Sequence, residues 1–399
     1  MRKLLYLIIP VMALSSTGIQ LKAADYYLPT HYRGIFYGQP TSARAAAMGL
    51  TTITLGGIEN VGYNPASIGL EQNIANVYFN YATGDQINVG SKYGFFGASY
   101  KLSEKLALGF GWQRWVEKDS PWSTIIGSFN ENVDKSSQLM YTLAGGYEVI
   151  PNLQIGLSGN FLVDKSVDDY VTNKTIIATL GAIYDMDVNW IKANNLENQR
   201  IRFAGSFLNL TMKNRIEQTY EDYLNYRDLP IHLNLGTSYH ASLPFNPDFL
   251  QSGQFFSDAP KTVDLSLHLQ FREVLKGPEK TVKNTNHENN TSFGIGTEAL
   301  FMKMIALRLG YYFEKRPKMQ KYDGGFWATT DKKGLTFGYG VKLPVNKLTD
   351  NKIPFDADLD FVTFRVLNEL NTKNYTHHSV FRDNNFLFAF GLKLRLVNN

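Results

Sequence analysis

The stretch that most constrains the fold is Thr291–Glu314, where two kinds of residue alternate on either side of a break at Met302–Met304. Strict alternation over ten or more residues is typical of a β-strand with two different faces. In both runs one face is large and apolar, and the other is small or polar. With a turn centred on Lys303, the pattern predicts a β-hairpin in which Glu298 and Arg308 lie opposite each other on the polar face.

The same alternation recurs to the C-terminus and predicts fourteen strands. Most are ten or more residues long, the length that a tilted strand needs to cross a bilayer, whereas strands of soluble β-sandwiches usually have five or six. An even strand number, with tight turns on one side and mostly long loops on the other, is characteristic of bacterial barrels. The sequence therefore favours an all-β, transmembrane antiparallel β-barrel over a sandwich. Its strands are expected at about 74–82, 90–101, 105–116, 137–149, 153–164, 174–187, 200–212, 229–243, 261–273, 291–302, 304–315, 334–343, 354–365 and 385–397.

The chain before the barrel, which we place at residues 74–399, has two parts. A basic start, a short apolar run and small residues predict a cleaved signal peptide over 1–23, because the apolar run is too short to span a membrane. Residues 24–73 lack alternation and contain a small-residue run with short helical potential, followed by Gly-Gly and Asn64-Pro65 breaks. This segment is expected to be compact and irregular: a small domain, an inhibitory arm or a plug inside the barrel.

Composition excludes several classes of function. The chain has no cysteine, which excludes disulfides, a lipoprotein anchor and thiolate metal sites. Removal of the signal peptide lowers the net charge from +4 to +1, so there is no electrostatic case for nucleic acid. Nothing resembles a nucleophile elbow, a phosphate loop or a metalloprotease helix, so we predict neither an enzyme nor a cofactor.

Several charged residues fall on the inner faces of the predicted strands. Three carboxylates at Asp356, Asp358 and Asp360 are spaced nearly 7 Å apart along one strand, too far to converge on Ca²⁺. A salt-bridge ladder across three strands is the better interpretation of these carboxylates. The pair of Glu298 and Arg308 in the hairpin is expected to fix the strand register; the alternative is that it forms a constriction of the lumen or anchors a plug. The predicted charged wall of the lumen comprises Glu298, Arg308, Asp356, Asp358, Asp360, Lys342, Lys393 and Arg395.

Two further groups of residues are weaker candidates for a functional site. Three histidines, His232, His240 and His268, face the lumen on adjacent strands, but their spacing does not match that of metal ligands and no metal site is predicted. A predicted outer loop carries bulky apolar residues that are costly to expose. These either pack over the barrel mouth or contact a ligand or partner; they include Trp122, Ile125, Ile126 and Phe129.

Two motifs in the N-terminal segment resemble the signature of FadL-like outer-membrane barrels. They are TSARAAAMGL at 41–50 and GYNPASIGL at 62–70, and the plug-motif residues are Ser42, Arg44, Met48, Gly49, Asn64, Pro65 and Ala66. The hairpin, with Gly-x-Glu at 296–298 and Leu-Arg-x-Gly-Tyr at 307–311, more specifically resembles the PorV/PorQ branch associated with type IX secretion in Bacteroidota. The resemblance implies a fourteen-stranded barrel in the outer membrane with the N-terminal segment in its lumen.

The same resemblance implies a function. In the PorV branch the barrel is a non-enzymatic component of type IX secretion, and the implied partners are outer-membrane lipid, a large translocon subunit and the C-terminal domains of secreted cargo. The alternative is a FadL-like channel for hydrophobic solutes such as long-chain fatty acids, and a further one is the lipid A modification attributed to this branch. Tyr63 stands where PorV sequences tend to have Trp, and the chain has no terminal aromatic residue, which favours a paralogue.

Overall fold

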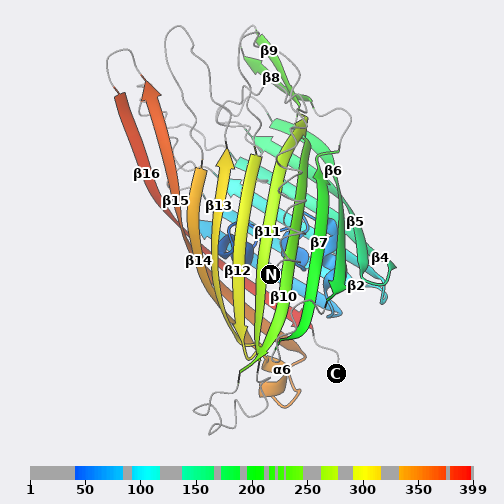
Figure 1. Ribbon diagram of the computed structural model, residues 1–399. Helices are drawn as coiled ribbons and strands as arrows, with labels where there is room; N and C mark the ends of the chain where they lie inside the picture. Colours follow the sequence, from blue (N-terminus) through cyan, green and yellow to red (C-terminus); the bar gives the residue numbers. More distant parts are fainter. Residues whose placement is uncertain are drawn as a thin grey trace.

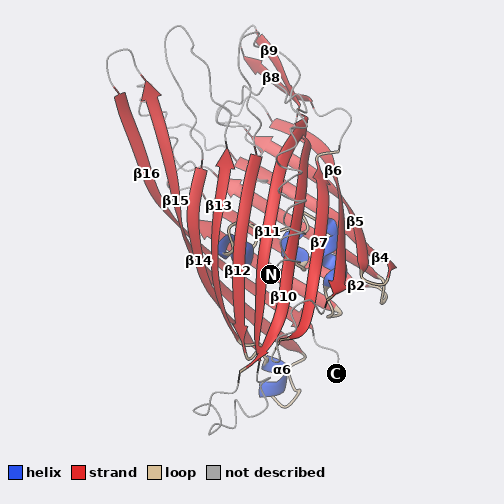
Figure 2. Ribbon diagram, viewed as in Figure 1, coloured by secondary structure: helices blue, strands red, loops and turns tan. Residues whose placement is uncertain are grey.

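Fourteen antiparallel strands form a closed barrel in the computed structural model (Figures 1 and 2). Each strand pairs with its neighbour along the chain, and β1 closes the barrel against β16. This confirms the predicted all-β barrel and its strand number. The structure describes residues 41–83, 92–116, 137–165, 172–188, 196–210, 215–220, 223–228, 231–245, 262–276, 291–315, 332–373 and 378–396. The barrel strands are β1 Ala75–Thr83, β2 Lys92–Lys101, β3 Leu106–Val116, β4 Ser137–Ile150, β5 Leu153–Lys165, β6 Thr172–Asp187, β7 Glu197–Leu208, β10 Ile231–Pro244, β11 Thr262–Lys276, β12 Thr291–Phe301, β13 Ile305–Lys315, β14 Lys332–Leu343, β15 Phe355–Lys373 and β16 His378–Leu396.

The hairpin of β12 and β13 has the register that its alternation predicts. Glu298 pairs directly with Arg308 across the two strands. Met302 and Lys303 adopt positive φ angles of 52° and 56°, and the N–H of Met304 donates to the carbonyl of Phe301 at 2.8 Å. Positive φ at two successive residues gives a turn whose twist matches that of the strands, so no glycine is needed to close this hairpin.

The outward faces of the strands form an apolar surface. On the hairpin, Leu307 and Leu309 are 45% and 52% exposed, whereas Arg308 between them is 2% exposed. Leucine, isoleucine and phenylalanine side chains are exposed in the same way around the barrel, for example at Leu143, Leu157 and Ile176. Such a band of exposed apolar residues is stable only against lipid, as in a transmembrane barrel.

The two ends of the barrel differ. Neighbouring strands are joined by short turns at one end, as at residues 102–105 and 151–152, and by longer connections at the other, as at 117–136. Since bacterial barrels have short periplasmic turns, we name the short-turn end the periplasmic end and the opposite one the outer end. A short helix, α6 (Val345–Leu348), lies in the turn between β14 and β15 at the periplasmic end (Figure 1).

Two predicted outer loops contain strands instead. β15 and β16 continue into the predicted loop 366–384 and pair with each other residue for residue, from Phe355 with Leu396 to Lys373 with His378. A second hairpin, β8 (Arg215–Tyr220) with β9 (Tyr223–Asp228), falls in the predicted loop 213–228. The loop predictions were wrong because strands beyond the bilayer need no apolar face, so the alternation that marks a spanning strand is not required there.

Residues 41–74, which we call the inner segment, lie inside the barrel (Figure 1). They form three short helices, α3 (Ala43–Ala47), η2 (Ile58–Asn60) and η3 (Pro65–Leu70). None of the helices in the described part of the chain is long and apolar enough to cross a membrane. The predicted signal peptide at 1–23 and the residues up to 40 lie outside the described part.

Side-chain caps explain why the two N-terminal motifs have the residues they do. Ser42 precedes α3, and its hydroxyl accepts a hydrogen bond from the N–H of Ala45 at 3.2 Å. Asn64 precedes η3, and its Oδ1 accepts from the N–H of Ala66 at 3.1 Å, with Pro65 at the first helical position. Serine and asparagine are preferred caps, and proline at this position loses no hydrogen bond. Both helices are therefore defined locally by the motifs.

Candidate functional site inside the barrel

Arg44 of the inner segment is bound to the wall of β12 and β13. Its Nη2 lies 2.6 Å from Oε1 of Glu298, and its Nε donates to Oε2 of the same carboxylate at 3.0 Å. Arg308 donates from Nε to Glu298 at 2.5 Å and from Nη1 to Asp360 on β15 at 2.7 Å. The side chains of Arg308 and Glu298 are 1% and 6% exposed. Four alternating charges thus form a chain in which each charge is paired. Glu298, Arg308 and Asp360 are buried and Arg44 is partly exposed, and pairing is the condition under which buried ions are tolerated.

A second ionic contact lies nearer the periplasmic end. Nζ of Lys393 on β16 lies 3.1 Å from Glu59 and 2.7 Å from Glu71, both in the inner segment. Burial raises the pKa of the Glu59 carboxyl above its ordinary value, a shift that Lys393 opposes and Glu71 reinforces. The hydroxyl of Ser99 on β2 also donates to Glu71. These contacts join the inner segment to two neighbouring regions of the wall.

The predicted salt-bridge ladder is therefore only partly formed. Asp358 accepts from Arg395 at 2.7 Å and lies opposite Lys342 in the register of β14 and β15. Lys393, which also lies opposite Asp358, turns to the inner segment, and Asp360 binds Arg308 two strands away. Asp356 accepts instead from the N–H of Asn346 in α6 at 3.2 Å. Alternation identifies the face of each residue correctly but not its partner, because long side chains reach carboxylates outside their own strand pair.

The turn at Thr52–Leu55, closed by a hydrogen bond from the N–H of Leu55 to the carbonyl of Thr52 at 3.1 Å, is held by polar side chains that the sequence did not single out. Oε1 of Gln270 accepts from the N–H groups of Thr52 and Ile53 at 2.6 and 3.1 Å. Arg202, paired with Asp185 at 2.6 Å, donates to the carbonyl of Thr54 at 2.7 Å. These side chains satisfy backbone groups of the turn that have no partner within the inner segment. The alternation in the sequence predicted only that these side chains face the lumen.

The three lumenal histidines do not form one group. Nδ1 of His268 lies 2.9 Å from the hydroxyl of Thr54, and the His240 ring meets the His268 ring edge-on at 5.3 Å. His232 is buried elsewhere on β10, eight residues before His240. Within the described residues, no three His, Cys, Asp or Glu side chains are grouped as metal ligands.

Inward-facing glycines let the backbone of the inner segment touch the wall. Gly49 has a φ of 65°, and a Cβ there would overlap the carbonyls of Ile295 and Tyr311. A Cβ on Gly310 would in turn overlap the backbone of Met48 and Gly49. The motif residues Asn64, Pro65 and Ala66 fit in the same way against glycines of β5 and β6, namely Gly156 and Gly181. The motifs and the glycines of distant strands are therefore complementary surfaces.

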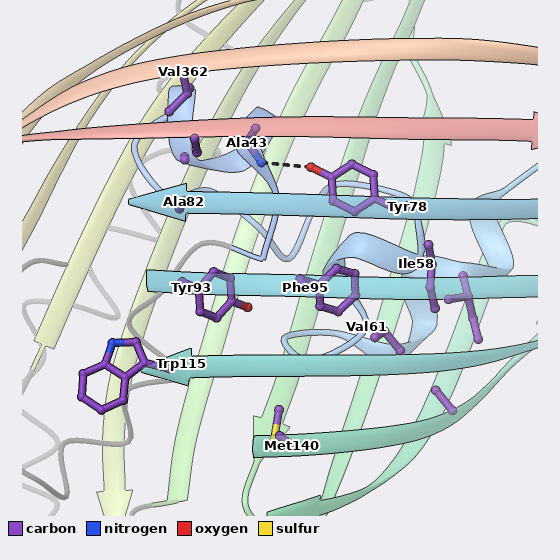
Figure 3. Close-up of a cluster of buried hydrophobic side chains, with 14 of the residues drawn as sticks. Ala43, Ile58, Val61, Tyr78, Ala82, Tyr93, Phe95, Trp115, Met140 and Val362 are labelled. Carbon is purple, nitrogen blue, oxygen red and sulfur yellow. Dashed lines mark hydrogen bonds between the residues drawn. The ribbon is translucent and has the colours of Figure 1, made fainter. Parts of the chain in front are cut away.

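The wall formed by β2 to β6 carries large apolar side chains towards the outer end, beside buried polar ones such as Gln113 and Gln138, although interior faces were expected to be small or polar. Figure 3 shows large side chains pointing inward from consecutive strands and meeting Ile58 and Val61 of the inner segment. The same view shows the N–H of Ala43 donating to the hydroxyl of Tyr78, at 3.1 Å. The buried inward residues are Tyr93, Phe95, Trp115, Met140, Leu162 and Ile177.

Two predicted site groups have different outcomes. All of the charged-wall and plug-motif residues lie in described parts of the barrel and the inner segment. The predicted outer-loop contact, Trp122, Ile125, Ile126 and Phe129, lies outside the described residues. What the structure brings together is thus an ionic contact on β12 to β16 and an apolar contact on β2 to β6, with the inner segment between them.

Comparison with solved structures places this architecture. A FadL homologue of Pseudomonas aeruginosa superposes with a TM-score of 0.50 at 10% identity, over 89% of this chain and 98% of that one. The fold is FadL-like. The toluene transporter TodX of Pseudomonas putida has a TM-score of 0.45 at 10% identity, over 88% of this chain and 97% of that one. No protein-family model matches the chain, and no curated protein matches it. At this identity the likeness concerns the fold and leaves function to be argued from the site.

Proposed function

We propose that the chain forms an outer-membrane channel for small hydrophobic solutes, in which the inner segment acts as the plug. The observation that carries this proposal is the apolar wall of β2 to β6. A pore for ions or polar solutes needs a wet, polar interior. Here the large inward side chains form one cluster that continues into Ile58, Val61 and Ile68 of the inner segment.

The FadL-like fold is compatible with this function without requiring it. The charged contacts support a plug, because they hold the inner segment without filling the apolar wall. The exposed apolar band and the predicted signal peptide support an outer-membrane location.

Uptake by whole cells tests the proposal. Cells that lack the barrel are compared with cells that carry it, using a labelled long-chain fatty acid, toluene and a polar control sugar. Faster uptake of either hydrophobic solute, with unchanged uptake of the sugar, is expected in cells with the barrel. Equal uptake of both hydrophobic solutes with and without the barrel would exclude the channel.

A second candidate function rests on the resemblance to the PorV/PorQ branch of type IX secretion. The observation that favours it is the motif set of the hairpin, Gly-x-Glu at 296–298 and Leu-Arg-x-Gly-Tyr at 307–311. Its Glu298 binds Arg44 of the inner segment, and its Arg308 binds Glu298. On this proposal the barrel binds a large translocon subunit or the C-terminal domains of cargo.

Affinity purification after mild detergent extraction separates the two functions. Recovery of a very large translocon subunit supports secretion, and recovery of the barrel alone supports a channel. Normal surface delivery of type IX cargo in a strain without the gene would exclude the secretion role.

A further inference from the structure

We infer that solutes pass along one seam of the plug, between Asn60–Gly62 of the inner segment and Gly111–Gln113 of β3, and that the rest of the inner segment stays in place. This inference rests on the proposed channel and specifies its route. We call this contact the β3 seam. Three features of this contact, taken together, support the inference.

The first feature is the distribution of polar anchors. Arg44, Glu59 and Thr54 each make a hydrogen bond or ion pair to the wall at 3.1 Å or less. In the part of the chain that the structure describes, Asn60, Val61 and Gly62 make no such contact with the barrel, and the amide of Asn60 donates within the inner segment, to the carbonyl of Gly56 at 3.3 Å. The seam is therefore held by apolar packing alone.

The second feature is a buried polar atom without a partner at this seam. Tyr93 donates from its hydroxyl to Oε1 of Gln113 at 3.1 Å, which turns the Gln113 amide nitrogen towards the inner segment. That Nε2 lies 3.0 Å from the position a Cβ on Gly62 would occupy. Nε2 of Gln113 has no hydrogen-bond partner among the described residues. Opening the seam hydrates this atom, so the closed seam is less favourable than the paired contacts elsewhere.

The third feature is the apolar surface on either side of Gln113 along the seam. Phe95 and Trp115 lie towards the outer end, and Val61 packs at mid-height, within van der Waals reach of Gly111 (Figure 3). Ala107, the second residue of β3, and Ala144 lie towards the periplasmic end and belong to the same cluster. Gln113 interrupts this surface, but a hydrophobic solute that follows β3 meets no charged side chain there, whereas the opposite wall presents buried charges.

A reversible cross-link tests the seam directly, and the cysteine-free chain gives a clean background. A Cβ on Gly111 would lie 3.4 Å from Cγ1 of Val61, so Val61→Cys with Gly111→Cys is placed to form a disulfide. The matched control is Ala43→Cys with Gly391→Cys, where the two Cβ atoms would lie 3.3 Å apart at a well-anchored contact. Uptake of the labelled fatty acid is measured in oxidised and reduced cells with equal amounts of barrel.

The expected result is loss of uptake to the background of cells without the barrel when the Val61–Gly111 bridge is closed, with recovery after reduction. The control bridge is expected to leave uptake unchanged. Uptake that persists through the closed seam, or that both bridges abolish, would overturn the inference while the channel function stands. No uptake by the wild-type barrel would overturn the channel and, with it, its route.

A single substitution covers the case in which the double variant does not assemble. Gly111→Leu fills the seam, because its Cβ would already lie 3.4 Å from both Phe95 and Val61. Uptake is expected to fall relative to Gly159→Leu, since a Cβ on Gly159 meets nothing within 4 Å. Equal uptake by two correctly assembled variants would contradict the seam.

Discussion

The two sides of the inner segment are attached to the barrel by different physical means. On β12 to β16 the contact consists of ion pairs, most of them buried, and of backbone packed into glycines. On β2 to β4 it consists chiefly of apolar side chains, with one hydrogen bond from Ser99 to Glu71 and with the unpaired Nε2 of Gln113. Breaking one partner of a buried ion pair leaves an uncompensated charge, but apolar surfaces separate without this penalty when an apolar solute replaces the contact. Under the proposed channel function, the difference implies that one side fixes the inner segment and the other yields.

The largest expected effect is on the fixed side. Arg308→Met leaves Glu298 and Asp360 buried with one cation fewer, and such a loss destabilises proteins by about 3–5 kcal/mol. Chemical unfolding of the detergent-solubilised barrel, followed by gel mobility, measures it. The control is Arg395→Met, because this side chain is 26% exposed and pairs with a single carboxylate. If both variants lose the same stability, the buried charge chain has no special role and the comparison fails.

A smaller effect is expected from filling a glycine contact on the same side. A side chain at Gly310 overlaps the backbone of Met48 and Gly49, and overpacking costs about 1–3 kcal/mol. For Gly310→Leu we expect the overlap to be relieved by displacement of the inner segment, so that protease cleaves within residues 41–73. Gly159→Leu, where a Cβ meets nothing within 4 Å, should leave cleavage unchanged. A protease-resistant Gly310→Leu variant would show that the contact adapts and does not define the fixed side.

The barrel could be predicted from the sequence because the rule that governs it is local. Alternation at Thr291–Glu314 reports which face each residue occupies, and a turn at Met302–Met304 then determines that Glu298 meets Arg308. The partner of Glu298 from the inner segment, Arg44, lies 254 residues away, and no periodic pattern relates the two. The alternation of faces along a strand predicts that a side chain points into the lumen, but not which residues occupy the lumen beside it.

The apolar wall shows the same limit in another form. Trp115 lies two residues beyond Gln113 and so has inward parity, but Ala107, Gly109 and Gly111 precede it and suggest a small, polar face. The change from small to large residues along β3 follows the inner segment, which occupies the periplasmic part of the wall and leaves the outer part to bulky side chains. The sequence does not show where the inner segment lies against the wall, so the boundary between small and bulky residues could not be predicted from it.

Substitution of the residue that caps η3 tests the part of the inner segment between the ionic contact and the apolar contact. Asn64→Ala removes the cap on Ala66 and the hydrogen bonds from Nδ2 to the carbonyls of Ile53 and Ala182, at 3.2 and 3.3 Å. Loss of such a cap costs about 1–2 kcal/mol, less than the buried charge. Urea unfolding measures the loss, and Ser103→Ala, which removes a similar bond to Leu106 in an exposed turn, is the control. Equal stability of the two variants would mean that η3 is held by its apolar packing, like the seam.

The smallest expected effect is that of a double variant on the yielding side. Gln113→Leu alone leaves the Tyr93 hydroxyl buried without its acceptor and should lose about 1–3 kcal/mol, as for other orphaned groups. Adding Tyr93→Phe removes the orphan, and the double variant should return to within about 1 kcal/mol of the wild type, because apolar replacement of both partners is nearly neutral. A double-mutant cycle by urea unfolding measures the recovery. If the double variant stays as unstable as Arg308→Met, then the polar pair at the seam contributes as much as the buried charges opposite, and the inner segment has no yielding side. Recovery, together with normal assembly, would instead show that polar groups at this seam are dispensable for stability, as expected of a contact whose role is to open.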